Sequence, residues 1–205
     1  MTSVPVSTTN TTAFSIDPYE ARIVSGIAES TTGVAPEVNV DYATAKAACE
    51  AAGKRLCTTT EWFAACVGAN NRAYAFQDSA TSPVSIDSVC DVARTTNNTP
   101  GSLPSLTGAH PSCKTEGLEL YDMIGNLAEW TTDPSGTPVA AGIPFYLASG
   151  VTLDDAKCLT TTTDVGSATI DPATKSTDVG FRCCKDAEST TTTSGGSGSA
   201  PTFPF

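Results

Sequence analysis

Eight cysteines are the side chains of this 205-residue chain most able to carry chemistry. No two have the Cys-x-x-Cys spacing of zinc or thioredoxin-like sites, and the single histidine, His110, argues against a Cys/His zinc site. An even number of cysteines without metal-site spacing predicts disulfides and an oxidising compartment; the alternative is a set of buried free thiols in a reducing cytosol. The cysteines are Cys49, Cys57, Cys66, Cys90, Cys113, Cys158, Cys183 and Cys184.

Other catalytic arrangements have little support in the sequence. His110 could join a serine and an aspartate in a triad, but no nucleophile-elbow motif accompanies it, and its place before Pro111 indicates a surface loop. The Gly-Gly-Ser-Gly-Ser run near residue 195 indicates a linker, because no Lys-Ser/Thr pair follows it as in a phosphate-binding loop.

The net charge of the chain makes some classes of binding partner less favourable than others. With 11 basic and 22 acidic residues the net charge is −11, which disfavours nucleic acids and anionic membranes and suits cations such as calcium. No stretch approaches the roughly 20 apolar residues of a membrane helix, so we expect no membrane span. The first twelve residues lack the basic and apolar regions of a secretion signal, and we therefore expect that a leader has been removed.

These side chains must be positioned by helices and strands that the sequence pattern predicts. A first helix carries apolar residues at i, i+3, i+4 and i+7, with Asp41 as the N-cap and Gly53 at the exit. The apolar residues are Ala45, Ala48, Cys49 and Ala52. Strands are predicted over Phe14–Glu20, where apolar and polar residues alternate, and over Gly180–Cys184.

A second helix follows closely. It begins with the capping-box pattern Thr58-x-x-Glu61, places Trp62 and Cys66 on one face, and ends at Gly68. Residues 69–116 are then loop-like, and a loop of this length needs a tether or a function. We expect a Cys90–Cys113 disulfide to close it, which would contribute roughly 3 kcal/mol by loop entropy.

The two ends differ in composition from the segment between them. Residues 1–13 are Thr-rich, whereas residues 188–205 combine a Thr run, a Gly/Ser linker and Pro-Thr-Phe-Pro-Phe. The terminal phenylalanines could dock on a neighbouring subunit by strand addition or pocket filling. The alternative is an unstructured end.

Three segments, in this order and at these separations, resemble the formylglycine-generating enzyme (sulfatase-modifying factor) family. They are Gly53–Trp62, Tyr121–Trp130 and Gly180–Cys184. The resemblance covers most of the chain and implies one α+β domain of the C-type-lectin-like fold over residues 14–187. Such a domain has two helices, short antiparallel strands and much irregular loop, and here it would be stapled by disulfides.

The resemblance also implies structural roles. Arg55 would pair with a carboxylate and Trp62 would fill the core. A bridge from Cys49 to Cys183 or Cys184 would match the helix-to-last-strand disulfide common in lectin-like domains.

The resemblance places a calcium ion at the Gly-Asn-x-x-Glu-Trp turn, bound by the Asn126 side chain, nearby backbone carbonyls such as that of Leu127, and the Glu129 carboxylate. A tight turn after Gly125 can point several oxygens inward, and calcium prefers oxygen ligands. The alternative is that Asn126 caps the turn while Glu129 forms a hydrogen bond or ion pair in the core. Asp91 lies where the family often has a ligand of a second calcium ion.

The enzymes of this family oxidise a substrate cysteine with copper held by two thiolates. In the matching segment, Ala148–Cys158, the first ligand position is Asp154, a hard oxygen donor that suits Cu(I) poorly, and only Cys158 remains near the second. The copper pair is therefore broken. We expect Cys158 to form a disulfide, with Cys183 or Cys184 as candidate partners.

The broken pair predicts a non-catalytic protein, secreted or at the cell surface. It would bind an unknown extracellular ligand or assemble with itself into a filament or coat. The alternative is an active copper-dependent oxidase of the formylglycine-generating type that acts on a protein cysteine, with Cys158 and a neighbouring cysteine as an altered metal site. A sugar-binding lectin has only the fold in its favour, because the sequence has no Glu-Pro-Asn-type motif.

Overall fold

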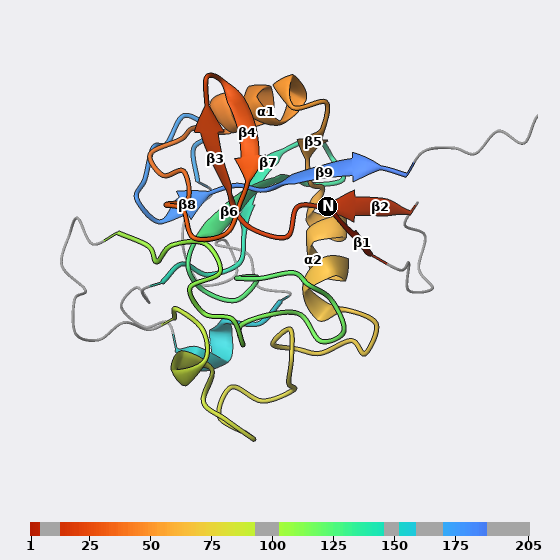
Figure 1. Ribbon diagram of the computed structural model, residues 1–205, viewed down its shortest axis with the longest axis vertical. Coiled ribbons are helices and arrows are strands. Elements are labelled where there is room, and N and C mark those ends of the chain that lie inside the picture. Colours follow the sequence, from red (N-terminus) through yellow and green to blue (C-terminus); the bar gives the residue numbers. More distant parts are fainter. Residues whose placement is uncertain (5–12, 93–102, 146–151, 159–169, 188–205) are drawn as a thin grey trace, which may run out of the picture.

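The computed structural model describes residues 1–4, 13–92, 103–145, 152–158 and 170–187. Within these ranges, two α-helices and nine short strands are arranged as an α+β domain, which confirms the predicted fold class. In Figure 1 the strands and α1 lie in the upper half, and the loop segments between α2 and β6 lie below them.

The main sheet joins the two ends of the described chain. Its strand order is β1-β2-β9-β5, and every neighbouring pair is antiparallel. The strands are β1 (Thr2–Val4), β2 (Phe14–Ile16), β9 (Cys183–Asp186) and β5 (Arg55–Leu56). β1 belongs to the Thr-rich segment 1–13, and it pairs with β2 at the edge of this sheet.

A second sheet has the order β7-β6-β8, from β7 (Pro138–Ala141), β6 (Ala128–Thr132) and β8 (Val179–Gly180). β6 is antiparallel to β7 but parallel to β8, so one pairing departs from the expected antiparallel pattern. A separate hairpin is formed by β3 (Ala21–Val24) and β4 (Ile27–Ser30).

Two strand predictions were too long. β2 covers only the first three residues of Phe14–Glu20, and the predicted strand Gly180–Cys184 is divided between β8 and β9. The chain passes from one sheet to the other at this break, where the carbonyl groups of Phe181 and Cys183 accept hydrogen bonds from Ala21 and Asp17. Residue 182, which lies in this break, is fully buried.

Both helices follow their predicted caps. α1 (Tyr42–Ala51) begins after Asp41, whose carboxylate accepts a hydrogen bond from Thr44 N at 2.7 Å. α2 (Thr59–Val67) begins with a complete capping box between Thr58 and Glu61. Gly53 and Gly68 follow the two helices with positive φ, as the exits required.

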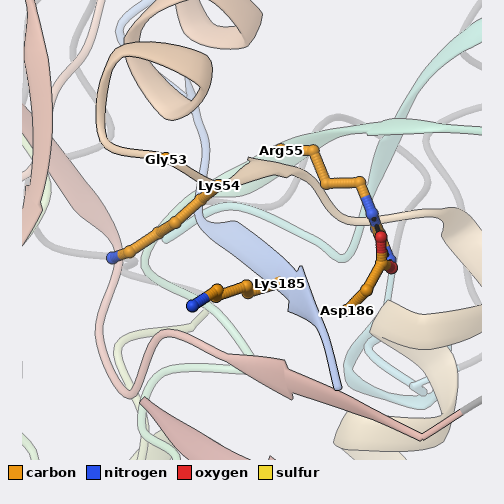
Figure 2. Close-up of a pocket in the computed structure, with 5 residues that line it drawn as sticks. All are labelled: Gly53, Lys54, Arg55, Lys185 and Asp186. Atoms are coloured by element: carbon orange, nitrogen blue, oxygen red, sulfur yellow. Dashed lines mark hydrogen bonds and ion pairs between the residues drawn. The ribbon is translucent and has the colours of Figure 1, made fainter. Parts of the chain in front are cut away.

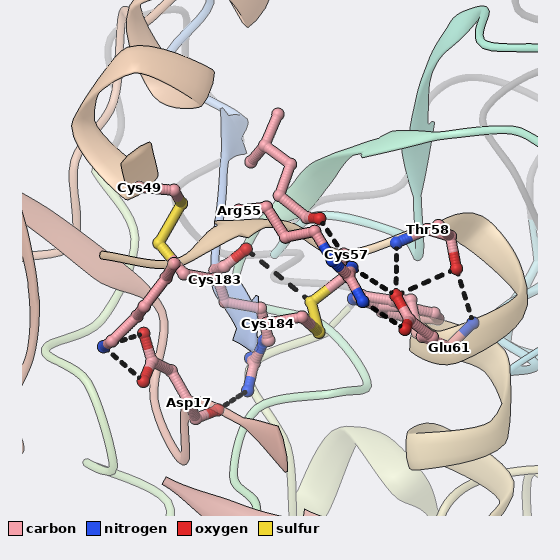
Figure 3. The surroundings of a disulfide bond; sticks show 12 residues. Asp17, Cys49, Arg55, Cys57, Thr58, Glu61, Cys183 and Cys184 are labelled. Atoms are coloured by element: carbon pink, nitrogen blue, oxygen red, sulfur yellow. Dashed lines mark hydrogen bonds and ion pairs between the residues drawn. A yellow bond between two sulfur atoms is a disulfide. The ribbon is translucent and has the colours of Figure 1, made fainter. Parts of the chain in front are cut away.

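Two disulfides join α1 and the residue after β5 to the last strand. Cys49 on α1 is bonded to Cys183, one of its two expected partners, and Cys57 is bonded to Cys184. Figure 3 shows both bonds at β9. Successive side chains of a strand point to opposite faces, so neighbouring cysteines can reach different elements.

The expected partner of Cys158 was wrong. It is bonded to Cys66 on α2, because Cys183 and Cys184 are already taken by Cys49 and Cys57. Cys66 and Cys158 are fully buried.

The long loop segment is closed as expected. Cys90 is bonded to Cys113, and the described part of residues 69–116 includes only the short 3-10 helix η1 (Ile86–Ser88) as a helical element. A second short 3-10 helix, η2 (Leu153–Asp155), precedes Cys158.

Candidate functional site

The turn at Gly125 and Asn126 is the centre of the candidate site. Gly125 has φ +79°, and a Cβ atom at this position would lie 2.3 Å from the carbonyl oxygen of Asp91. The same carbonyl accepts a hydrogen bond from Asn126 N at 2.8 Å. Glycine is therefore required here both by the backbone conformation and by the close approach of residue 91.

The turn brings two of the predicted calcium ligands together. Asn126 Oδ1 and Asp91 Oδ2 both accept hydrogen bonds from Ser105 N, at 2.9 and 3.2 Å. Asn126 Nδ2 donates to Glu20 Oε2 at 2.5 Å, and Leu127 N donates to Glu20 Oε1 at 3.0 Å. The site is thus built from the turn, from the segment after β2, and from the loop around residue 105.

Glu129 is placed differently, in a fully buried ion pair. Its carboxylate accepts hydrogen bonds from Arg182 Nε at 2.7 and 2.9 Å and from Arg182 Nη2 at 2.7 Å. Trp62 Nε1 donates to Glu129 Oε2 at 2.7 Å. Both charged side chains have no exposed surface. The core ion pair, which the sequence left open as the alternative, is the arrangement in this structure.

Arg182 also connects parts of the chain that are distant in sequence. Its Nη1 donates to the carbonyl of Asp17 at 3.2 Å, and its Nη2 donates to the carbonyl of Tyr121 at 3.0 Å. A guanidinium group has five N–H donors in a planar fork, which suits it to such a buried junction. Burial alone would lower the pKa of Arg182, but the charge of Glu129 and the hydrogen bonds to it raise that pKa above its ordinary value.

Two further buried carboxyl groups face this junction. Burial, together with the charges of Asp122 and Glu129, raises the pKa of Glu20 well above its ordinary value. Burial raises the pKa of Asp122 to about 6, although Gly108 N donates to its Oδ2 at 2.8 Å. The guanidinium group of Arg182 is therefore hydrogen-bonded to one buried carboxyl group, that of Glu129. Its charge also attracts two others, those of Glu20 and Asp122.

The side-chain oxygens that the family would use to bind calcium are already engaged in other interactions. Both oxygens of Glu129 are engaged by Arg182, and the oxygens of Asn126 and Asp91 point at the N–H of Ser105. Within the described ranges, no group of three or more His, Cys, Asp and Glu side chains is arranged to hold a metal ion. Binding of calcium itself stays a prediction.

The segment that matches the copper site contains no pair of thiols in its described part. Cys158 is in the buried disulfide with Cys66, and the carbonyl of Asp154 accepts a hydrogen bond from Tyr74 Oη at 3.1 Å. Burial and the neighbouring Asp154 raise the pKa of Tyr74 to about 12. Positions 148–151 of this segment lie outside the described residues.

His110 is half-buried, and its Nε2 lies 3.5 Å from Ser105 Oγ. Within the described part of the chain, no hydrogen bond joins His110 to a carboxylate. The serine and the histidine therefore lack the third group that orients a catalytic histidine.

A shallow pocket of about 280 Å³ lies between β5 and β9, lined by Gly53, Lys54, Arg55, Lys185 and Asp186 (Figure 2). Three of the charged side chains that line it, Lys54, Arg55 and Asp186, are in ion pairs. Arg55 pairs with Glu61 at 2.6 Å and with Asp186, as the resemblance implied, and Lys54 pairs with the buried Asp17 at 2.7 Å. The pocket is therefore a weak candidate for an anion site.

The sequence patterns did not identify Arg182 or Glu20 as members of the site. A signal for Arg182 was present, because a cation stands between Phe181 and Cys183 in an otherwise apolar run. Lys, Arg, Asp and Glu are rarely fully buried without a partner, so such a position predicts a buried acid elsewhere.

Comparison with known proteins supports one family. The model of the sulfatase-modifying factor enzyme 1-like domain matches residues 4–187. No curated protein sequence matches the chain.

Similar solved structures share the fold at low sequence identity. PvdO from Pseudomonas aeruginosa has a TM-score of 0.60 at 16% identity, covering 85% of this chain and 81% of PvdO. CarF has a TM-score of 0.56 at 18% identity and 88% coverage of each chain, and Treponema denticola variable protein 1 has 0.57 at 14% identity and 85% coverage of each. None of the helices in the described ranges has the length and apolar character needed to span a bilayer.

Proposed function

Because the chain belongs to the family of sulfatase-modifying factor enzyme 1-like domains, we propose that it is a non-catalytic member of that family which acts by binding. It would work in an oxidising compartment, secreted or at the cell surface. There it would use its stapled domain as a rigid support for loops that contact an extracellular partner.

The state of the cysteines is the observation that carries this proposal. All eight are in disulfides, so no thiolate remains for copper. Cu(I) is held by soft thiolate ligands, whereas Asp154 offers only oxygen where the family has its first thiolate. Cys158, near the second position, is fully buried and bonded to Cys66.

We propose binding rather than self-assembly as the use of the scaffold. The long loops are tied down by Cys90–Cys113 and by the turn at Gly125, and loops on a rigid scaffold commonly carry recognition. The feature that predicted assembly, the tail 188–205, lies outside the described residues.

Counting free thiols in denaturant without reductant tests the non-catalytic part of the proposal. We expect no free thiol in the native protein, and eight after reduction as the control. Two reactive thiols together with Cu(I) affinity would instead support the copper oxidase.

Electron microscopy and size-exclusion chromatography of the purified protein test the choice between binding and assembly. We expect uniform single particles. Ordered polymers would show that the domain serves as a filament or coat subunit.

A further inference from the structure

We infer that the side-chain carbonyl of Gln77 binds one ordered water molecule inside the loop that follows α2, at the lower end of the molecule in Figure 1. The inference does not depend on whether the protein is a binding module. It rests on the burial of Gln77, on the two hydrogen bonds that fix its amide group, and on the acceptor atom that these bonds leave open.

The amide group of Gln77 joins two parts of this loop. Gln77 is only 4% exposed, and its Nε2 donates to the carbonyl of Ser79 and, at 2.7 Å, to the carbonyl of Val84. Both hydrogens of the amide nitrogen are therefore used. A backbone hydrogen bond from Ile86 N to Ala80 O, at 2.9 Å, closes the same segment. The position of the side chain is thus fixed by its surroundings.

These contacts allow only one orientation of the amide group. If its nitrogen and oxygen were exchanged, the oxygen would face two carbonyl oxygens with no hydrogen between them. Oε1 is therefore the atom directed away from Ser79 and Val84. Among the residues that the structure describes, it is the one buried side-chain nitrogen or oxygen atom that has no hydrogen-bond partner.

A buried acceptor without a donor is unfavourable, and proteins commonly satisfy such atoms with internal water. Water suits Gln77 Oε1 because it supplies an O–H donor without bringing a charge into the interior. Internal waters usually form about three hydrogen bonds, so a second protein partner is needed close by.

The carbonyl groups that hold the amide can provide that partner. The oxygen and nitrogen of an amide group are about 2.3 Å apart, so Oε1 of Gln77 lies within about 5 Å of the carbonyl oxygen of Val84. A water molecule with two hydrogen bonds of about 2.8 Å spans up to about 5.6 Å. It can therefore donate one hydrogen to Oε1 and the other to this carbonyl, which has a second lone pair.

A crystal structure of the full chain, at a resolution where ordered waters are clear, gives the direct test. We expect a water oxygen within about 3.2 Å of Gln77 Oε1. The inference would be overturned by a protein N–H or O–H donor at this atom, by a metal ion there, or by an Oε1 with nothing at hydrogen-bond distance.

Nuclear magnetic resonance tests the same site in solution. Gln77 is the only glutamine of the chain, so isotope labelling of glutamine gives one pair of side-chain amide signals. We expect a nuclear Overhauser effect between water and this side chain with the sign of a long-lived complex. The exposed Asn70, whose Nδ2 donates to Glu116, is the control and should show the sign of transient contact. The same transient sign at Gln77 would contradict a bound water.

A variant tests whether the glutamine itself holds the water. Gln77→Met keeps the length of the side chain and removes the amide, so magnetic relaxation dispersion of water oxygen should count one long-lived water fewer than in the wild type. Asn70→Met, the matched change at the surface, should leave the count unchanged. An unchanged count in a folded Gln77→Met variant would overturn the assignment to Oε1. If that variant does not fold, the two measurements on the wild type decide.

Discussion

Arg182 is the residue on which the buried polar cluster depends. Three carboxyl groups, Glu20, Asp122 and Glu129, are almost completely buried around it. One guanidinium cannot neutralise three ionised carboxylates, so ionisation of the cluster is costly, and the raised pKa values of Glu20 and Asp122 express that cost. The cluster therefore favours a bound proton more strongly in the folded chain than in the unfolded chain.

A pH dependence follows from Asp122. Its pKa is about 6 in the folded protein, above its ordinary value, so its contribution is fully present in acid and is lost as the pH rises from about 4 through 6. Asp122→Asn should remove this loss, because asparagine tolerates the φ of 58° and can still accept the hydrogen bond from Gly108 N. We expect the variant to be more stable than the wild type by up to about 2–3 kcal/mol at pH 8, and equal to it near pH 4, in urea denaturation.

Asp133→Asn is the control for this measurement, with the opposite sign. Hydrogen bonds from Ser135 and Thr137 lower the pKa of this exposed carboxyl, so its contribution is present at neutral pH and is lost as the pH falls. If the two variants showed the same dependence on pH, burial of Asp122 would not be the cause.

At the scale of single residues, the sequence predicted only some members of the candidate site. Asn126, Asp91 and Glu129 were identified as site candidates by resemblance, and Asn126 and Asp91 do lie together. The partner of Glu129 was missed, because Arg182 is 53 residues away in sequence. A cation in an apolar run predicts a buried acid, but not which acid it is. Long-range ion pairs of this kind are set by how the elements pack.

At the scale of elements, local signals predicted both helices well. The N-caps Asp41 and Thr58 and the exits at Gly53 and Gly68 are encoded within a few residues of each helix end. Strand ends were less accurate, because β8 and β9 are separated by a change of sheet that depends on tertiary contacts.

The turn at Gly125 should be far less tolerant of substitution than a turn of similar backbone conformation elsewhere. Gly125 and Gly117 have φ of 79° and 78°, but a Cβ at Gly125 would collide with the carbonyl of Asp91, whereas nothing lies within 4 Å of a Cβ at Gly117. We expect Gly117→Ala to cost about 1–2 kcal/mol from the left-handed conformation alone. Gly125→Ala should cost at least about 3 kcal/mol, because residue 91 must also move.

Chemical denaturation of both alanine variants measures this difference. Because the backbone conformation is matched, the difference between them reports the contact with residue 91 and not the strain of positive φ. Equal losses of unfolding free energy would show that residue 91 can move away from a Cβ atom at position 125 at no energetic cost.

At the scale of the whole molecule, disulfides connect segments that are far apart in sequence. The even cysteine count predicted the staples, and the spacing of the loop predicted Cys90–Cys113. The remaining connectivity was not readable, because four pairs can be joined in many ways and the fold decides which cysteines meet. Cys49 of α1 and Cys57, the residue after β5, are bonded to neighbouring residues of β9.

These two bonds should act together rather than independently. With either bond intact, the other closes a ring that runs only from Cys49 to Cys57 and from Cys183 to Cys184, roughly ten residues in all. Loss of one bond therefore frees little additional chain. When both bonds are lost, the next disulfide that links these two parts of the chain is Cys66–Cys158. A much longer segment of the unfolded chain is then unconstrained.

Replacement of each bonded pair by alanines measures this coupling. The loop-entropy relation gives about 2.5 kcal/mol for either bond alone and about 6–7 kcal/mol for both, more than the sum of the single losses. Urea denaturation of the three variants, compared with wild type, gives the coupling as in a double-mutant cycle. The Cys90–Cys113 pair is the control, because its 23-residue loop shares no short ring with the other two, and its loss should add to either. Strictly additive losses for the pairs at β9 would show that the bonds stabilise the native state separately and do not constrain one shared segment of the unfolded chain.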